Sequence, residues 1–276
     1  MLKDVLVNLT VDAERDMAAE YAISLARVFE AHVSGISFAY EAVLPGSIFG
    51  GVAVELVQAQ RAATEKMAQA AVAKFDAAAR GAGVSAQSQL LHATHIDAAE
   101  SFGRIARRFD LSVVAQAEPN KLPGRDLIIE AALFASGRPV LVVPYIQRDG
   151  FTLERAMVCW DGSRSAARAL GDAMPLLERA KAIEVVVVSG DPGKSDEIPG
   201  ADVAHHLARH GRKVELQRIV VRDLDVANTL LSHAADVGCD FMVMGGYGHS
   251  RLRELVLGGV TRGILQSMTV PTLMSH

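Results

Sequence analysis

Short runs of apolar, often β-branched residues alternate with longer amphipathic runs along the whole chain. Apolar runs of this length predict buried strands, and runs with a period near 3.6 predict helices that bury one face. In the first half, we expect strands at Asp4–Leu9, His32–Phe38, Ser85–Leu91, Leu111–Gln116 and Pro139–Val143. We expect helices between them at Glu14–Glu30, Val54–Arg80, Ile96–Phe109 and Asp126–Ala135.

The second half repeats this order. Its expected strands are Arg155–Trp160, Ala182–Ser189, Lys213–Val221, Asp240–Gly245 and Pro271–Met274. Its expected helices are Ser165–Lys181, Asp202–Gly211, Asp225–Val237 and Gly259–Gln266. Alternation of strands and helices with continuously apolar strands is typical of a parallel sheet covered on both faces. The fold class is therefore α/β, with one doubly wound, five-stranded parallel sheet in each half.

Two landmarks indicate that the halves arose by duplication. Asp110 begins an apolar strand in the first half and Asp240 begins one in the second, 130 residues later; Pro139 and Pro271 lie 132 residues apart. A chain of 276 residues suits two domains of roughly 150 residues. We therefore expect domains at 1–147 and 152–276, joined by a short polar stretch.

Composition excludes several classes of protein. Half of the residues are hydrophobic, 22% are charged and the net charge is −4, so neither a disordered chain nor a basic nucleic-acid-binding surface is indicated. The chain has two cysteines, Cys159 and Cys239, which suits a reducing compartment. Asp4 and Asn8 interrupt the apolar start, and apolar runs such as Val185–Val188 fall far short of the roughly 18 residues that cross a bilayer. We expect a cytoplasmic protein with no membrane partner.

The segment from Met244 to Thr261 is the most informative for function. It leaves the carboxyl end of an expected strand, contains several glycines and enters an expected helix near Gly259. Glycines let backbone amides approach an anion, and the start of a helix favours negative charge. The segment therefore suits a phosphate chain. The alternative is a glycine-rich turn that only packs the helix on the strand.

The second half resembles the universal stress protein family. Its nucleotide-binding pattern is Gly, two residues, Gly, nine residues, Gly and then Ser or Thr, and Gly245, Gly248 and Gly258 match it in register. Gly259 departs from the pattern, because it stands where the hydroxyl residue is expected. The resemblance extends to Val158–Ser163, which is similar to the family's first strand and its Asp-Gly-Ser turn, and to the closing strand after Val270.

The resemblance implies an adenine nucleotide (ATP, ADP or AMP, with or without Mg) across the carboxyl edge of the sheet. Asp161 would bind the ribose, backbone near Cys159 and Ser189–Gly190 would flank the base, and Thr261 would offer a hydroxyl. The loss of a hydroxyl at Gly259 would remove one phosphate hydrogen bond, about 1–2 kcal/mol, which leaves AMP, ADP or a different small anion open beside ATP. The nucleotide-binding residues implied by the resemblance are Cys159, Asp161, Gly190, Met244, Gly245, Gly248, Gly258, Gly259, Val260 and Thr261.

The first half lacks these features. Thr10 takes the place of Asp161, and Asp126 and Leu127 align with Gly258 and Gly259. An acidic side chain at that helix start would repel phosphate. We therefore interpret the first half as a degenerate domain with a scaffold or regulatory role; the alternative is that it binds a different ligand.

Other motifs are weaker. Most of them are better explained as ordinary surface or core residues than as chemical sites. For Arg251 and Arg253, contacts to phosphate and a solvated surface both stay open. We expect no catalytic residue and no metal ligand. These motifs are the P-loop-like Gly193-Lys194-Ser195, the i, i+4 pair His206 and His210, the two cysteines as a redox pair, Arg251 and Arg253 beside the glycine segment, and a hydrolase-like set of His249, Ser250 and Asp161.

The resemblance also implies a strand order of 3-2-1-4-5 and pairing of the two halves through their last strands. The edges expected to meet are Val140–Val143 and Thr272–Met274. The preferred function is a stress-response protein that senses or signals by binding a nucleotide, with an unknown protein partner. Two chains could also form a homodimer, but no sequence pattern indicates one. The alternatives are a slow ATP hydrolase and a ligand-free interaction scaffold.

Overall fold

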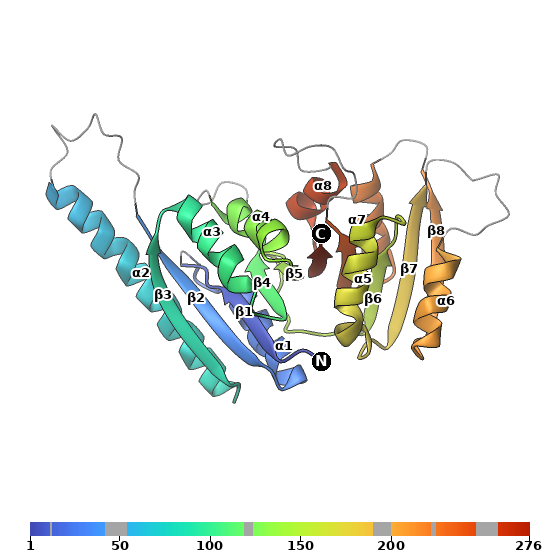
Figure 1. Ribbon diagram of the computed structural model, residues 1–276, viewed down its shortest axis with the longest axis horizontal. Coiled ribbons are helices and arrows are strands. Elements are labelled where there is room, and N and C mark those ends of the chain that lie inside the picture. Colours follow the sequence, from blue (N-terminus) through green and yellow to red (C-terminus); the bar gives the residue numbers. More distant parts are fainter. Residues whose placement is uncertain (12, 42–53, 119–123, 190–199, 222–224, 247–258) are drawn as a thin grey trace. The chain divides into compact units, whose positions relative to one another are not determined.

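The computed structural model describes residues 1–276 apart from 12, 42–53, 119–123, 190–199, 222–224 and 247–258 (Figure 1). The described residues form two compact units. The N-terminal unit comprises the described parts of Leu2–Ala115 and Pro119–Arg138. The C-terminal unit comprises Gln116–Glu118 and the described parts of Pro139–His276.

The N-terminal unit alternates strands and helices as the sequence predicts. Its elements are β1 (Asp4–Asn8), α1 (Met17–Phe29), β2 (His32–Tyr40), α2 (Val54–Gly81), β3 (Ala86–Ala93), α3 (His95–Ala106), β4 (Leu111–Ala115) and α4 (Arg125–Ala135). The strands lie in the order β3-β2-β1-β4, and β1 pairs in parallel with β2 and β4, as does β2 with β3. Helix α1 begins at Met17 rather than at the expected Glu14, because the Asp16 side chain accepts a hydrogen bond from the amide of Ala19 and caps the helix.

The C-terminal unit repeats the pattern and also contains β5, a strand that the sequence analysis expects in the domain at 1–147. Its elements are β5 (Val140–Val143), β6 (Arg155–Cys159), α5 (Arg164–Leu177), β7 (Ala182–Ser189), α6 (Ala201–Arg209), β8 (Val214–Val220), α7 (Val226–Asp236), β9 (Phe241–Gly245), α8 (Gly259–Ser267) and β10 (Thr272–Ser275). Strands β6 to β10 form a parallel sheet in the order β8-β7-β6-β9-β10, which confirms the expected 3-2-1-4-5 order.

Strand β5 extends this sheet beyond β10. Leu141 lies opposite Leu273, and the two strands run antiparallel. The expected meeting of Val140–Val143 with Thr272–Met274 is confirmed. All four residues of β5 and all four of β10 are buried, so the pairing covers an edge that would otherwise expose backbone groups. Gln116, which is fully buried, donates from its side chain to the carbonyl of Leu265 and fixes the last turn of α8 to this edge.

Helices cover both faces of each sheet. In the N-terminal unit, Ser37 faces α2 and donates to the carbonyl of Ala68, whereas Tyr40, of opposite parity on the same strand, stacks on His95 of α3 with ring centroids 4.2 Å apart. In the C-terminal unit, Glu184 of β7 faces α7, and the alternate residue Val187 faces the start of α6. None of the described helices is long and apolar enough to span a bilayer.

The aspartates that mark the repeat have the same role in both units. Asp110, just before β4, accepts hydrogen bonds from the amides of Lys3 (2.8 Å) and Asp4 (3.0 Å) at the start of β1. Asp240, just before β9, accepts from the amides of Glu154 (2.8 Å) and Arg155 (3.0 Å) at the start of β6. Each carboxylate therefore fixes the amino ends of the two central strands against each other.

Candidate functional site

The turn between β6 and α5 presents Asp161 at the carboxyl edge of the C-terminal sheet. Asp161 is exposed, and its Oδ1 accepts a hydrogen bond from the amide of Ser163 at 2.9 Å. Gly162 has φ +75°, a left-handed conformation that glycine adopts without strain. The Ser163 hydroxyl then accepts from the amide of Ala166 at 3.1 Å and caps α5. The Asp-Gly-Ser sequence thus folds into a rigid turn that holds a carboxylate at the edge of the sheet.

Gly245, at the end of β9, is required by packing. A Cβ at this position would lie 2.5 Å from the amide nitrogen of Ala166 and 2.7 Å from the hydroxyl of Ser165, both in the first turn of α5. These distances are far below van der Waals contact, so only glycine lets β9 approach the helix. This observation supports the alternative that part of the glycine segment packs helix on strand.

Gly246 fixes the beginning of the glycine segment. Its amide donates to the carbonyl of Ser275 at 2.8 Å, and its carbonyl lies 3.1 Å from Nδ1 of His276. The Ser275 hydroxyl in turn donates to Asp172 of α5 at 2.9 Å. The end of β9 is therefore held by both β10 and α5.

The start of α8 lies open. Gly259 is exposed, and a Cβ there would meet no atom of the described residues within 4 Å. The first helical amides and the positive end of the dipole are suited to an anion. Thr261, two residues into the helix, is buried, with 4% of its surface exposed. Gly190, Gly248 and Gly258 lie outside the described residues, as do the predicted loop 193–195 and His249, Ser250, Arg251 and Arg253.

Cys159 and Met244 lie side by side on β6 and β9, next to this edge. Burial, with smaller contributions from Cys239 and Asp161, raises the pKa of the Cys159 thiol. Burial also raises the pKa of Cys239 to about 11. Both cysteines are free. Because the thiolate is the reactive form, the structure favours inert apolar thiols over a redox pair.

The corresponding place in the N-terminal unit is filled by side chains. Gly124 caps α4 with φ +111°, and a Cβ there would lie 2.5 Å from Nδ1 of His95, whose ring stacks on Tyr40. At the carboxyl end of β1, Asp16 accepts from the amide of Thr10 at 2.6 Å and from that of Ala19 at 3.1 Å. A carboxylate therefore already caps α1 in this unit. Burial lowers the pKa of His95 and raises that of Asp16.

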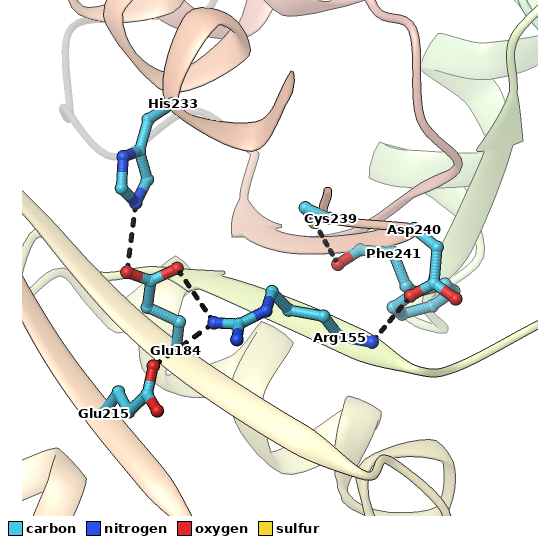
Figure 2. A network of polar contacts seen from close by, with 7 residues as sticks. All are labelled: Arg155, Glu184, Glu215, His233, Cys239, Asp240 and Phe241. Carbon is cyan, nitrogen blue, oxygen red and sulfur yellow. Dashed lines mark hydrogen bonds and ion pairs between the residues drawn. The ribbon is translucent and has the colours of Figure 1, made fainter. Parts of the chain in front are cut away.

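A polar network at the opposite edge of the C-terminal sheet was missed by the sequence analysis (Figure 2). The carboxylate of the buried Glu184 lies 3.1 Å from Nε2 of His233. Nη1 of Arg155 lies 4.0 Å from the carboxylate of Glu184 and 3.2 Å from that of Glu215. The available signal was a glutamate inside the apolar run of β7. The network joins the starts of β6, β7 and β8 to α7, away from the carboxyl edge. The rings of His206 and His210 contact each other, and the described residues contain no group of three or more metal-ligating side chains.

Comparisons with known proteins agree with this layout. Residues 152–276 match the Universal stress protein family. A curated relative, Universal stress protein Slr1230 of Synechocystis sp., is 26% identical over 140 residues, which cover 49% of this chain and 46% of the relative. The match thus spans about half the length of that relative.

Solved structures resemble the chain over nearly its full length. A universal stress protein from Archaeoglobus fulgidus DSM 4304 has a TM-score of 0.72 at 16% identity, covering 99% of this chain and 97% of that one. The functionally unknown protein PA1789 from Pseudomonas aeruginosa PAO1 has a TM-score of 0.60 at 15% identity, covering 99% and 92%. At these identities the likeness establishes the fold alone.

Proposed function

We propose that the C-terminal unit, whose residues 152–276 belong to the universal stress protein family, binds an adenine nucleotide at the carboxyl edge of its sheet. In open α/β sheets, ligands bind outside the carboxyl ends of the strands, near the point where the strand order reverses. In this unit that point lies between β6 and β9, which carry Asp161 and Gly245 at or just beyond their carboxyl ends.

The contrast between the two helix starts is the observation that carries the proposal. As far as the described residues go, nothing lies within 4 Å of a Cβ at Gly259 at the start of α8, whereas the ring of His95 lies against Gly124 at the start of α4. Asp161 is exposed at the C-terminal edge, while the corresponding Thr10 is only 9% exposed and its amide is bound to Asp16. We therefore assign one nucleotide to the C-terminal unit and interpret the N-terminal unit, within 1–147, as degenerate at this place.

The residues present fit an adenine nucleotide. The Asp161 carboxylate would accept hydrogen bonds from ribose hydroxyls, and the amides at the start of α8, from Gly259 and Val260, would donate to phosphate. Cys159 and Met244 would form the wall beside the base. A nucleotide changes the conformation of the protein only if it binds one of two conformations more tightly than the other. The difference between the two affinities sets how far the populations shift. Sensing or signalling to a protein partner is the role that this arrangement supports.

The test is release of ligand together with thermal stabilisation. The purified chain is denatured and the supernatant is chromatographed; we expect adenine nucleotide. After removal of bound ligand, ATP, ADP or AMP at about 100 times its dissociation constant should stabilise the fold by about 2.7 kcal/mol, seen as a higher melting temperature.

A matched pair of variants locates the site. Asp161→Ala is expected to abolish the thermal shift, and Thr10→Ala, at the corresponding position of the N-terminal unit, is expected to keep it. No released nucleotide and no shift with any of the three nucleotides would refute the proposal in favour of an interaction scaffold. The observation that favours an interaction scaffold is the glycine at position 259, which lacks the hydroxyl that would bind phosphate.

A further inference from the structure

Helix α2 distinguishes the two units. It has 28 residues, whereas the corresponding helix α6 has 9. At 1.5 Å per residue, α2 is about 42 Å long. Figure 1 shows it lying along β2 and β3. One stripe of α2, with Ala68, Phe75 and Ala79, is buried against the sheet.

A second stripe of α2 faces a cavity. Spacings of three and four residues place six residues of α2 on one side of the helix, and Phe75 belongs to both stripes. The six are Met67, Ala70, Ala71, Lys74, Phe75 and Ala78. They line a cavity of about 350 Å³ together with Ala19 and Ile23 of α1 and residues of the β1–α1 connection. Small-molecule sites begin at about 300 Å³ and are mostly apolar with a few polar groups. The alanines leave between α1 and α2 a space that larger side chains would fill.

The described residues at the mouth of the cavity include charged groups, most of which already have partners. Arg15 donates twice from Nε to the Glu20 carboxylate, both at 2.8 Å. Both oxygens of Asp16 accept backbone amides, from Thr10 and Ala19. These three side chains therefore neither attract nor repel a ligand strongly.

Lys74 is held differently. Its Nζ donates to two neutral carbonyls of the β1–α1 connection, Ala13 at 3.4 Å and Glu14 at 3.2 Å. These long bonds keep the ammonium beside the cavity, and no ion pair joins it to a carboxylate of the described residues. An anion there would gain a charge-assisted hydrogen bond. The Glu14 carboxylate belongs to an exposed residue at the rim and is solvated.

We propose that this cavity binds a small amphipathic carboxylate, with its apolar part against the alanine stripe of α2 and its carboxylate at the Lys74 ammonium. The site lies in the N-terminal unit and involves none of the residues assigned to the nucleotide. It gives that unit a ligand of its own, although the place that corresponds to the nucleotide site is filled by His95.

The test is calorimetric titration of the whole chain with decanoate. We expect saturable binding of one molecule per chain. Lys74→Gln should weaken it about fivefold, which corresponds to about 1 kcal/mol for a partly exposed ion pair. Ala71→Leu, which puts a bulky side chain on the wall of the cavity, should weaken it at least as strongly.

Two controls match these variants. Glu14→Gln removes the other rim charge, and Ala73→Leu adds the same bulk on an exposed position of α2 outside the cavity; both should bind like the parent chain. If Ala71→Leu does not fold, the comparison of Lys74→Gln with Glu14→Gln still decides. Absence of saturable binding, tighter binding of decyltrimethylammonium than of decanoate, or equal effects of Ala71→Leu and Ala73→Leu would overturn the proposal.

Discussion

Replacing Gly245 by alanine separates the packing role of the glycine segment from a role in ligand binding. The added Cβ would lie 2.5 Å from the amide nitrogen of Ala166. Ordinary contact needs about 3.5 Å or more. The clash is with backbone at the first turn of α5, so neither side can yield by changing a rotamer. We therefore expect a loss near or above the upper end of overpacking effects, about 3 kcal/mol.

Gly259→Ala is the matched control. Its Cβ meets no atom of the described part of the chain within 4 Å, and alanine is the better helix former at the start of α8. Its stability should be unchanged or higher by up to about 1 kcal/mol.

Urea unfolding followed by circular dichroism measures both variants. We expect the midpoint to fall clearly for Gly245→Ala and to stay or rise for Gly259→Ala. If Gly245→Ala unfolds like the parent chain but no longer binds nucleotide, then the packing explanation is wrong and the residue serves the ligand directly.

Three further predictions concern other parts of the chain. Asp240→Ala should cost about 1–3 kcal/mol in urea unfolding, because two backbone amides lose a charged acceptor; a loss no larger than that of an exposed-surface alanine variant would contradict this. Cys159 and Cys239 should resist iodoacetamide at pH 8 in the folded state and react in urea, since burial raises both thiol pKa values; rapid labelling of the folded chain would argue against it. His95 has a pKa lowered by burial, so the unfolded chain takes up its proton more readily and the melting temperature should fall as pH drops from 7 towards 5. His95→Gln should show a shallower fall, and equal slopes would refute the assignment.

Much of the fold was predictable because its signals are local. Continuously apolar strands such as β9 are stable only when both faces are buried. Asp110 and Asp240 recur because each accepts backbone amides at the start of the neighbouring central strand in its own unit. The Asp161 turn was equally readable, because Asp-Gly-Ser supplies an acceptor, a left-handed residue and a helix cap in sequence.

The rest depends on contacts between distant segments. Nothing near Gly245 in the sequence shows that α5 occupies its Cβ position, and nothing near His95 shows that its ring packs against Gly124. The partners of Glu184 come from β6 and α7. The cavity beside α2 likewise arises because a stripe of alanines meets α1, and an alanine stripe alone reads as an ordinary helix.

A crystal structure of the chain grown with ATP would test the central claim most directly. The account predicts one adenine nucleotide, with its ribose at Asp161 and its phosphates at the start of α8, and none beside His95 in the N-terminal unit. A nucleotide bound in the N-terminal unit, or density showing the space at Gly259 closed by the chain's own side chains, would contradict it.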